Sequence, residues 1–263
     1  MDEIDEATDR VILGPAKTSR RITDKEKRLV AIHEAGHAVI GLKLQDAQEV
    51  HKITIIPRGM AGGYTMMLPK EEKIGIMTKE ELIAQITGLL GGRASEENFM
   101  HEITTGASDD LKRATKIARS MVTEYGMSDL GPIQLEEKSE GVFLGRDYTK
   151  SRDFSDQVAL EIDNEVRKIL EECYKEAKKL LAKHETLVLL IADALMKYET
   201  LTKEQIQLLV EKGTITPEEY QEVLDKNDLD KKTLEELKEL AKEKGIKGYT
   251  KMNKEELKTA LKN

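Results

Sequence analysis

The feature that most constrains this chain is a pair of histidines four residues apart, in the stretch His33-Glu34-Ala35-Gly36-His37. Residues at that spacing lie one turn apart on the same face of a helix, so both imidazoles can point at a single metal ion. The residues that flank the motif are apolar, namely Val30, Ala31, Ala38, Val39 and Ile40. The helix is therefore expected to be partly buried, and its polar side chains then need partners. The pattern predicts a zinc site in which the glutamate acts as a general base.

Composition narrows the class of protein. The chain has 263 residues, a net charge of −8, 35% charged residues and no tryptophan, which favours a helix-rich protein with room for two units. The acidic balance argues against nucleic-acid binding by the whole chain. The one cysteine, Cys173, excludes an intramolecular disulfide framework. No apolar run is long enough to cross a bilayer, so we expect a soluble chain.

Local signals predict most of the elements. Thr23 and Glu26 form a T-x-x-E capping box, which starts the histidine helix and carries it to about Leu44. Two β-prone runs at 53–56 and 63–68 predict an antiparallel pair. Further helices are expected at about 78–90 (where Gly91-Gly92 would end the helix), 109–125, 155–183, 185–198 and 203–212.

The motif leaves the third metal ligand open, because a catalytic zinc keeps three protein ligands and one free position. A metzincin would need a histidine six residues after His37, and Lys43 stands there, so that class is excluded. The remaining candidates are Glu96, Glu97, Asp109 and Asp110. A loop that contains Gly106 delivers the two aspartates to a helix start, and this placement favours an aspartate.

Four blocks of sequence together resemble the peptidase domain of the FtsH family, in that family's order and spacing. They are His33–Val39, Lys52–Gly59, Gly91–Glu97 and Thr105–Leu111. The resemblance covers roughly residues 1–212. It implies a membrane-anchored, ATP-dependent zinc protease that assembles as a hexamer and degrades unfolded and membrane proteins. It also implies that the parent protein works at the cytoplasmic face of the bacterial inner membrane.

Site residues follow from the resemblance. It implies that His33, His37 and Asp110 bind zinc and that Glu34 is the general base. Asp109 stands where the family usually has asparagine, which leaves open whether it shares in metal binding.

Two supporting roles are hypotheses at this point. Glu96 resembles a family glutamate near the metal, and we expect it to orient a ligand histidine by accepting its second N–H. The strand residues Gly63, Tyr64, Thr65 and Met66 are expected to pair main chain to main chain with an extended substrate.

The expected fold is mainly α, a helical zinc peptidase domain with a small β-hairpin, followed by a long-helix bundle and a small helix-extended-helix unit. Residues 1–20 would be a linker from an ATPase module that this fragment lacks, 21–212 the peptidase domain and 213–228 a second linker. Residues 229–263 resemble the small unit of the Rho N-terminal and SAP type, which often contacts nucleic acid. Alternating lysine and glutamate there is more typical of a solvated face. The competing function is a binding module that presents this unit to a nucleic acid or protein.

Overall fold

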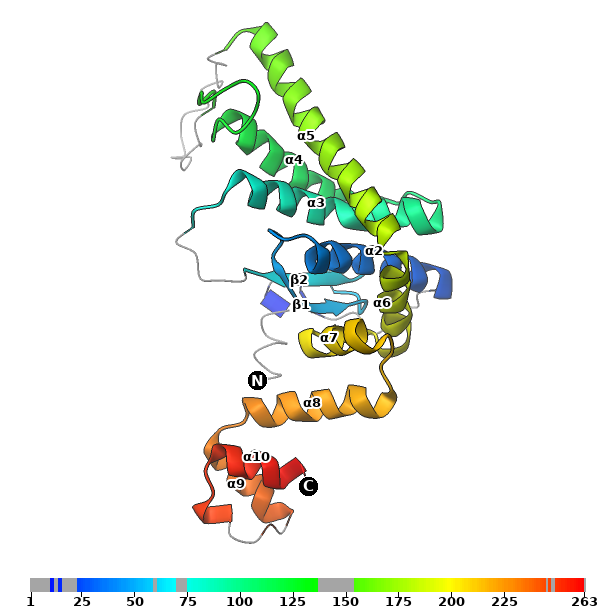
Figure 1. Ribbon diagram of the computed structural model, residues 1–263, viewed down its shortest axis with the longest axis vertical. Coiled ribbons are helices and arrows are strands. Elements are labelled where there is room, and N and C mark those ends of the chain that lie inside the picture. Colours follow the sequence, from blue (N-terminus) through cyan, green and yellow to red (C-terminus); the bar gives the residue numbers. More distant parts are fainter. Residues whose placement is uncertain are drawn as a thin grey trace. The chain divides into compact units, whose positions relative to one another are not determined.

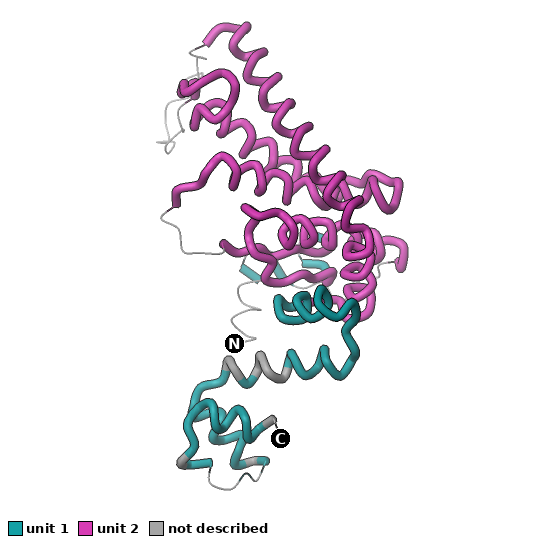
Figure 2. The backbone as a smooth tube through the Cα atoms, in the orientation of Figure 1, with its two compact units in different colours: residues 1–19, 57–61, 202–263 teal, residues 20–56, 62–201 magenta. Residues whose placement is uncertain are grey.

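The computed structural model describes residues 10–11, 14–15, 23–58, 61–69, 75–136, 154–244, 246 and 249–262 (Figure 1). The linker expected at residues 1–20 lies mostly outside these residues. The described chain is mainly helical with a three-stranded sheet, which confirms the predicted fold class. It forms two units, shown in Figure 2: a larger unit of residues 20–56 and 62–201, and a smaller unit that includes 57–61 and 202–263.

The elements of the larger unit are α2 (Asp24–Lys43), β1 (Glu49–Thr54), β2 (Tyr64–Leu68), α3 (Lys79–Ser95), the π-helical turn η1 (Glu96–Met100), the 3-10 turn η2 (Thr105–Ala107), α4 (Ser108–Thr123), α5 (Asp156–Lys183), α6 (Glu185–Tyr198) and β3 (Thr200–Thr202). Those of the smaller unit are α7 (Lys203–Lys212), α8 (Pro217–Lys231), α9 (Leu234–Glu243), the 3-10 turn η3 (Tyr249–Lys251) and α10 (Lys254–Lys262).

Helix α2 is the centre of the larger unit. The predicted capping box starts it, since the Glu26 amide donates to the Thr23 hydroxyl and the Thr23 amide donates to the Glu26 carboxylate. Its residues from Ala31 to Gly41 are all buried. The helix packs against α3, α6 and both strands of the predicted pair, and Figure 1 shows it between α3 and those strands. The histidine motif therefore lies in the core and not on a surface helix.

The sheet has the strand order β2-β1-β3. Strands β1 and β2 are antiparallel, with Val50 opposite Met67 and Thr54 opposite Tyr64, which confirms the predicted pairing. The predicted range of the first strand, 53–56, was wrong, because β1 begins at Glu49 and ends at Thr54. The third strand was not predicted. It is three residues long and follows Glu199, whose carbonyl accepts a hydrogen bond from the Ile55 amide at 2.9 Å.

Helix α3 contradicts the predicted helix end at Gly91-Gly92, because it continues to Ser95. The glycines are needed where two helices cross. A Cβ on Gly91 would lie 2.8 Å from the Ile40 side chain, and a Cβ on Gly36 would lie 2.5 Å from the Gly91 carbonyl oxygen. Close approach of α2 and α3 thus explains glycines that a helix otherwise disfavours. N-terminal to Gly91, the α3 residues Leu82, Ile86 and Leu90 pack with α4 and α5 in an apolar core.

The smaller unit starts before the expected linker, because residues 202–212 belong to it as well. Residues 213–228 were expected to be a linker, but α8 begins there, with Thr216 as its N-cap and Pro217 at its first position. Helices α9 and α10 enclose the four buried residues Leu237, Ala241, Leu257 and Leu261. None of the described helices combines the length and the apolar character that crossing a membrane requires.

Candidate metal centre

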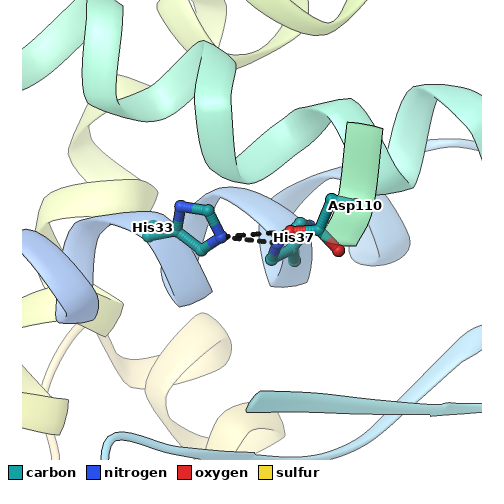
Figure 3. Close-up of side chains that lie close together, drawn as sticks. All are labelled: His33, His37 and Asp110. Carbon is teal, nitrogen blue, oxygen red and sulfur yellow. Dashed lines mark hydrogen bonds and ion pairs between the residues drawn. The ribbon is translucent and has the colours of Figure 1, made fainter. Parts of the chain in front are cut away.

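Three side chains converge on one point in the larger unit (Figure 3). The Nε2 atoms of His33 and His37 lie 3.1 Å apart, and each lies 3.4 Å from Oδ2 of Asp110. Four ligands at zinc-bond length in a tetrahedron are separated by about 3.3 Å. In the described part of the chain, this is the one such group of potential metal ligands. The donor set and its spacing therefore fit zinc.

The far sides of both imidazoles are held by acceptors. Nδ1 of His33 donates to Oε1 of Glu96 at 2.7 Å, and Nδ1 of His37 donates to the Gly88 carbonyl oxygen at 2.8 Å. A carboxylate and a carbonyl only accept, so each Nδ1 carries a proton and each Nε2 is left as the metal donor.

Gly92 makes room for the two rings. A Cβ at this position would lie 2.4 Å from Nε2 of His33 and 2.6 Å from Nε2 of His37. Such separations are shorter than any side-chain contact, so only glycine allows α3 to pass over the imidazoles here. The close crossing of α2 and α3 therefore leaves room for the two imidazole rings only because Gly92 has no side chain.

Glu34 lies on the strand side of α2. It is 5% exposed, and its Oε2 accepts a hydrogen bond from the Thr65 hydroxyl of β2 at 2.7 Å. Burial raises the pKa of Glu34, against the opposing effects of both histidines and Thr65. A raised pKa suits a carboxylate that takes up a proton and later returns it.

The acidic groups dominate the electrostatics of the centre. Burial disfavours the charged form of His33, but hydrogen bonds to Asp110 and Glu96 outweigh it and raise the pKa of His33 to about 10. Burial also opposes ionisation of Asp110, yet hydrogen bonds from both histidines hold its pKa well below the usual value. Surroundings that favour a proton on a histidine also favour a divalent cation, which binds in competition with that proton.

The other candidate ligands lie elsewhere. Asp109 is exposed and outside the three-residue group. Glu97 bonds to Tyr174 and Lys178 on α5, each at 2.5 Å. Glu96 contacts His33 and lies outside the three-residue group, so its role in orienting that histidine stays a prediction.

Sequence reasoning missed the contributions of Gly88 and Gly92. Gly88 acts through a backbone carbonyl, which carries no sequence signal, and Gly92 through the absence of a side chain. Thr65 was predicted as a residue of the substrate strand, but its hydroxyl contacts Glu34. The alternation of a strand could have suggested that Thr65 and its neighbours Tyr64 and Met66 face opposite ways.

A buried HExxH helix joined by an aspartate from a second helix defines a zinc metallopeptidase domain. Residues 20–209 match the model of peptidase family M41, and residues 228–262 match that of the Rho termination factor N-terminal domain. Residues 196–226 match a family of uncharacterised phage proteins. The chain belongs to peptidase family M41.

Individual relatives agree with this assignment. The chain is 60% identical over 196 residues to the ATP-dependent zinc metalloprotease FtsH of Acholeplasma laidlawii and 55% identical over 196 residues to that of Bacillus subtilis. These matches cover 74% of this chain but 30% and 31% of the two relatives. The predicted family resemblance is confirmed, as is the prediction of zinc as cofactor. The chain spans about a third of the length of these relatives.

Proposed function

We propose that the chain is the zinc endopeptidase domain of an FtsH-type ATP-dependent protease, with His33, His37 and Asp110 as the metal ligands. The observation that supports this most is the set of three donor atoms 3.1–3.4 Å apart, with both histidine Nδ1 atoms already occupied. A zinc ion held by these residues supplies a Lewis acid for the attacking water and for the peptide carbonyl.

Glu34 is the proposed proton carrier. The Thr65 hydroxyl holds Oε2, which leaves Oε1 as the oxygen that takes a proton from the attacking water. The same oxygen then passes the proton to the nitrogen of the leaving amine. Thr65 thereby fixes the plane of the carboxylate during both transfers.

Strand β2 is the proposed binding site for the substrate backbone. It is at one edge of the sheet, and its Thr65 contacts Glu34, so an extended peptide paired with this edge would run beside the proposed base. Main-chain pairing by Gly63, Tyr64, Thr65 and Met66 needs no fixed side-chain sequence in the substrate. That property suits a protease of unfolded chains.

The features of the whole protein are proposed from the names of the relatives and from the resemblance to the FtsH family. The relatives are named as ATP-dependent, and this chain covers about a third of their length. We infer a parent with an ATPase module and a membrane anchor, assembled as a hexamer, with its peptidase on the cytoplasmic side. By itself, the peptidase domain of residues 20–209 is expected to cleave peptides and proteins that are already unfolded.

The first experiment measures zinc per chain after dialysis. The native protein is expected to retain one zinc, and Asp110→Ala should lose most of it. Asp109→Ala is the matched control, since this exposed neighbour carries the same charge and should leave the zinc content unchanged. Full retention in Asp110→Ala would overturn the ligand assignment.

A second experiment separates chemistry from metal binding. Glu34→Gln should keep its zinc but lose cleavage of an internally quenched peptide by about 10³-fold or more. The same loss is expected with a reduced, alkylated protein as substrate. Activity within tenfold of the native rate would show that Glu34 is not the base.

A second candidate function, contact with nucleic acid through residues 228–262, has the support of the family match to that segment. Two of its described lysines are engaged within the unit: Lys244 donates to the Leu261 carbonyl oxygen and Lys258 pairs with Glu255. We therefore favour a role of residues 228–262 as a solvated surface over contact with nucleic acid. Fluorescence anisotropy with a labelled RNA oligonucleotide at low salt tests this, and salt-sensitive binding would establish the alternative.

A further inference from the structure

Thr104 lies between the turn η1 and the turn η2, and it contacts Glu96 twice. Its amide donates to Oε2 of Glu96 at 2.9 Å, and its hydroxyl donates to Oε1 at 3.1 Å. From the other side, Arg93 of α3 donates to the Thr104 carbonyl oxygen at 2.9 Å. One residue of this loop is thus held through its amide, its hydroxyl and its carbonyl.

Glu96 shares its carboxylate between two tasks. Oε1 accepts from both Nδ1 of His33 and the Thr104 hydroxyl, while Oε2 accepts from the Thr104 amide. The side chain is completely buried. The carboxylate that orients the first proposed ligand therefore also anchors the loop that follows η1.

That loop delivers the third proposed ligand. The Thr104 hydroxyl accepts from the Gly106 amide at 3.1 Å and so caps η2, after which α4 begins directly at Ser108. Asp110 stands in the first turn of α4. Among the described residues, the carboxylate of Asp110 contacts the two histidines. Its position must therefore be set largely by the backbone that carries it.

We propose that Thr104 is a positioning residue for the metal centre, which ties the loop of Asp110 to the carboxylate that orients His33. This inference rests on the ligand assignment proposed above. Through Thr104, the orientation of one ligand and the placement of another depend on the same buried group. Loss of the Thr104 hydroxyl should loosen both ligands and weaken zinc binding.

A purely local role for Thr104 is the competing explanation. A threonine that only capped η2 would lower the thermal stability of the metal-free protein when changed, without any specific dependence on Glu96. The two explanations differ in zinc affinity and in the coupling between positions 104 and 96.

The test measures zinc affinity of the full chain by competition with a chromophoric chelator. Thr104→Val keeps the shape and the backbone amide but removes the hydroxyl, and is expected to weaken zinc binding about tenfold. Thr104→Ser restores the hydroxyl and should bind within about twofold of the native protein. Thr115→Val is the control, because this exposed hydroxyl of α4 bonds only to the Leu111 carbonyl oxygen of its own helix. Unchanged affinity in Thr104→Val would overturn the proposal.

A double-mutant cycle with Glu96→Ala supplies the decisive comparison. If Thr104 acts through Glu96, Thr104→Val should change zinc affinity by less than about twofold once Glu96 is absent. A full tenfold loss in that background would overturn the proposal. Failure of the ligand assignment itself would look different, because the native chain would then hold no zinc or Asp110→Ala would retain it.

Discussion

Where α2 crosses α3, the buried residues are unusually polar. His33, Glu34, His37, Ser95 and Glu96 are each at most 8% exposed. In the pair α9 and α10, the core is purely aliphatic: Leu237, Ala241, Leu257 and Leu261. Buried polar groups destabilise a fold unless each has a partner, whereas aliphatic burial needs no further explanation. The polar residues buried between α2 and α3 therefore indicate a function in addition to folding. The core of α9 and α10 is explained by folding alone.

Each of these five buried polar side chains has a hydrogen-bond partner. The Ser95 hydroxyl, for example, donates to the Ile32 carbonyl oxygen of α2 at 2.8 Å and so links the two helices. The pair accommodates these contacts because glycines bring the backbones together. The close approach at the glycines and the polar contacts between α2 and α3 thus depend on each other. Single substitutions can test each of them separately.

The largest effect is expected from Gly92→Ala. The added Cβ would overlap both imidazoles. Zinc affinity should therefore fall by about 100-fold or more, at least as much as when a residue that orients a metal ligand is removed. Gly88→Ala is the matched control in the same helix, because nothing lies within 4 Å of its Cβ and the carbonyl that holds His37 is retained. It should keep zinc and raise stability by about 0.5 to 1 kcal/mol. Chelator competition and urea unfolding measure both quantities.

Gly36→Ala tests the helix crossing without touching a ligand. Its Cβ would lie 2.5 Å from the Gly91 carbonyl oxygen, which is backbone and cannot rotate away. Forced separation of the helices should lower the free energy of unfolding by about 2 to 3 kcal/mol. Urea unfolding of the metal-free protein measures the change. A loss below about 0.5 kcal/mol would show that the crossing is not tightly packed there.

A smaller effect is expected where η1 meets α5. Hydrogen bonds from Lys178 and Tyr174 hold the pKa of Glu97 below its ordinary value of 4.5. A lowered carboxyl pKa stabilises the fold above the unfolded value and loses this effect as pH falls through the folded value. Lys178→Met should therefore destabilise by about 0.5 kcal/mol at pH 7 and by less below pH 4. Thermal melts at the two pH values measure it, and an equal loss at both would contradict the ion pair.

No effect on zinc is expected from Leu257→Ala. This residue is fully buried in the small core of the C-terminal unit, and its truncation should destabilise that unit by about 3 kcal/mol and locally unfold it. Zinc content and peptide cleavage should stay at native values. A fall in either would show that the two helix pairs compared above are coupled.

The sequence alone predicts the elements whose signals are local. The capping box at Thr23, the period of α5 and the β-prone runs of β1 and β2 each depend on neighbours within a few residues. The two histidines and Glu34 of the centre are predictable for the same reason, since one helical turn relates them.

The remaining features depend on contacts between distant segments. Gly91-Gly92 resembles a helix break in sequence, and only the crossing with α2 explains why the helix continues. Strand β3 is too short for any periodicity, and it exists because β1 offers it an edge. Asp110 could not be separated from Asp109 by local argument, because the direction of α4 decides which carboxylate faces the histidines.

Asp110 stands 77 positions after His33, so the centre joins chain segments that an unfolded molecule keeps far apart. Closing a flexible loop of that length costs about 4 kcal/mol of chain entropy. A peptide with the histidine motif alone would lack the third donor, however strongly its helix formed. All three proposed ligands therefore come together only in the folded protein. Release of the ion during denaturation should follow the same cooperative curve as the loss of helix, which makes zinc occupancy a direct readout of native structure.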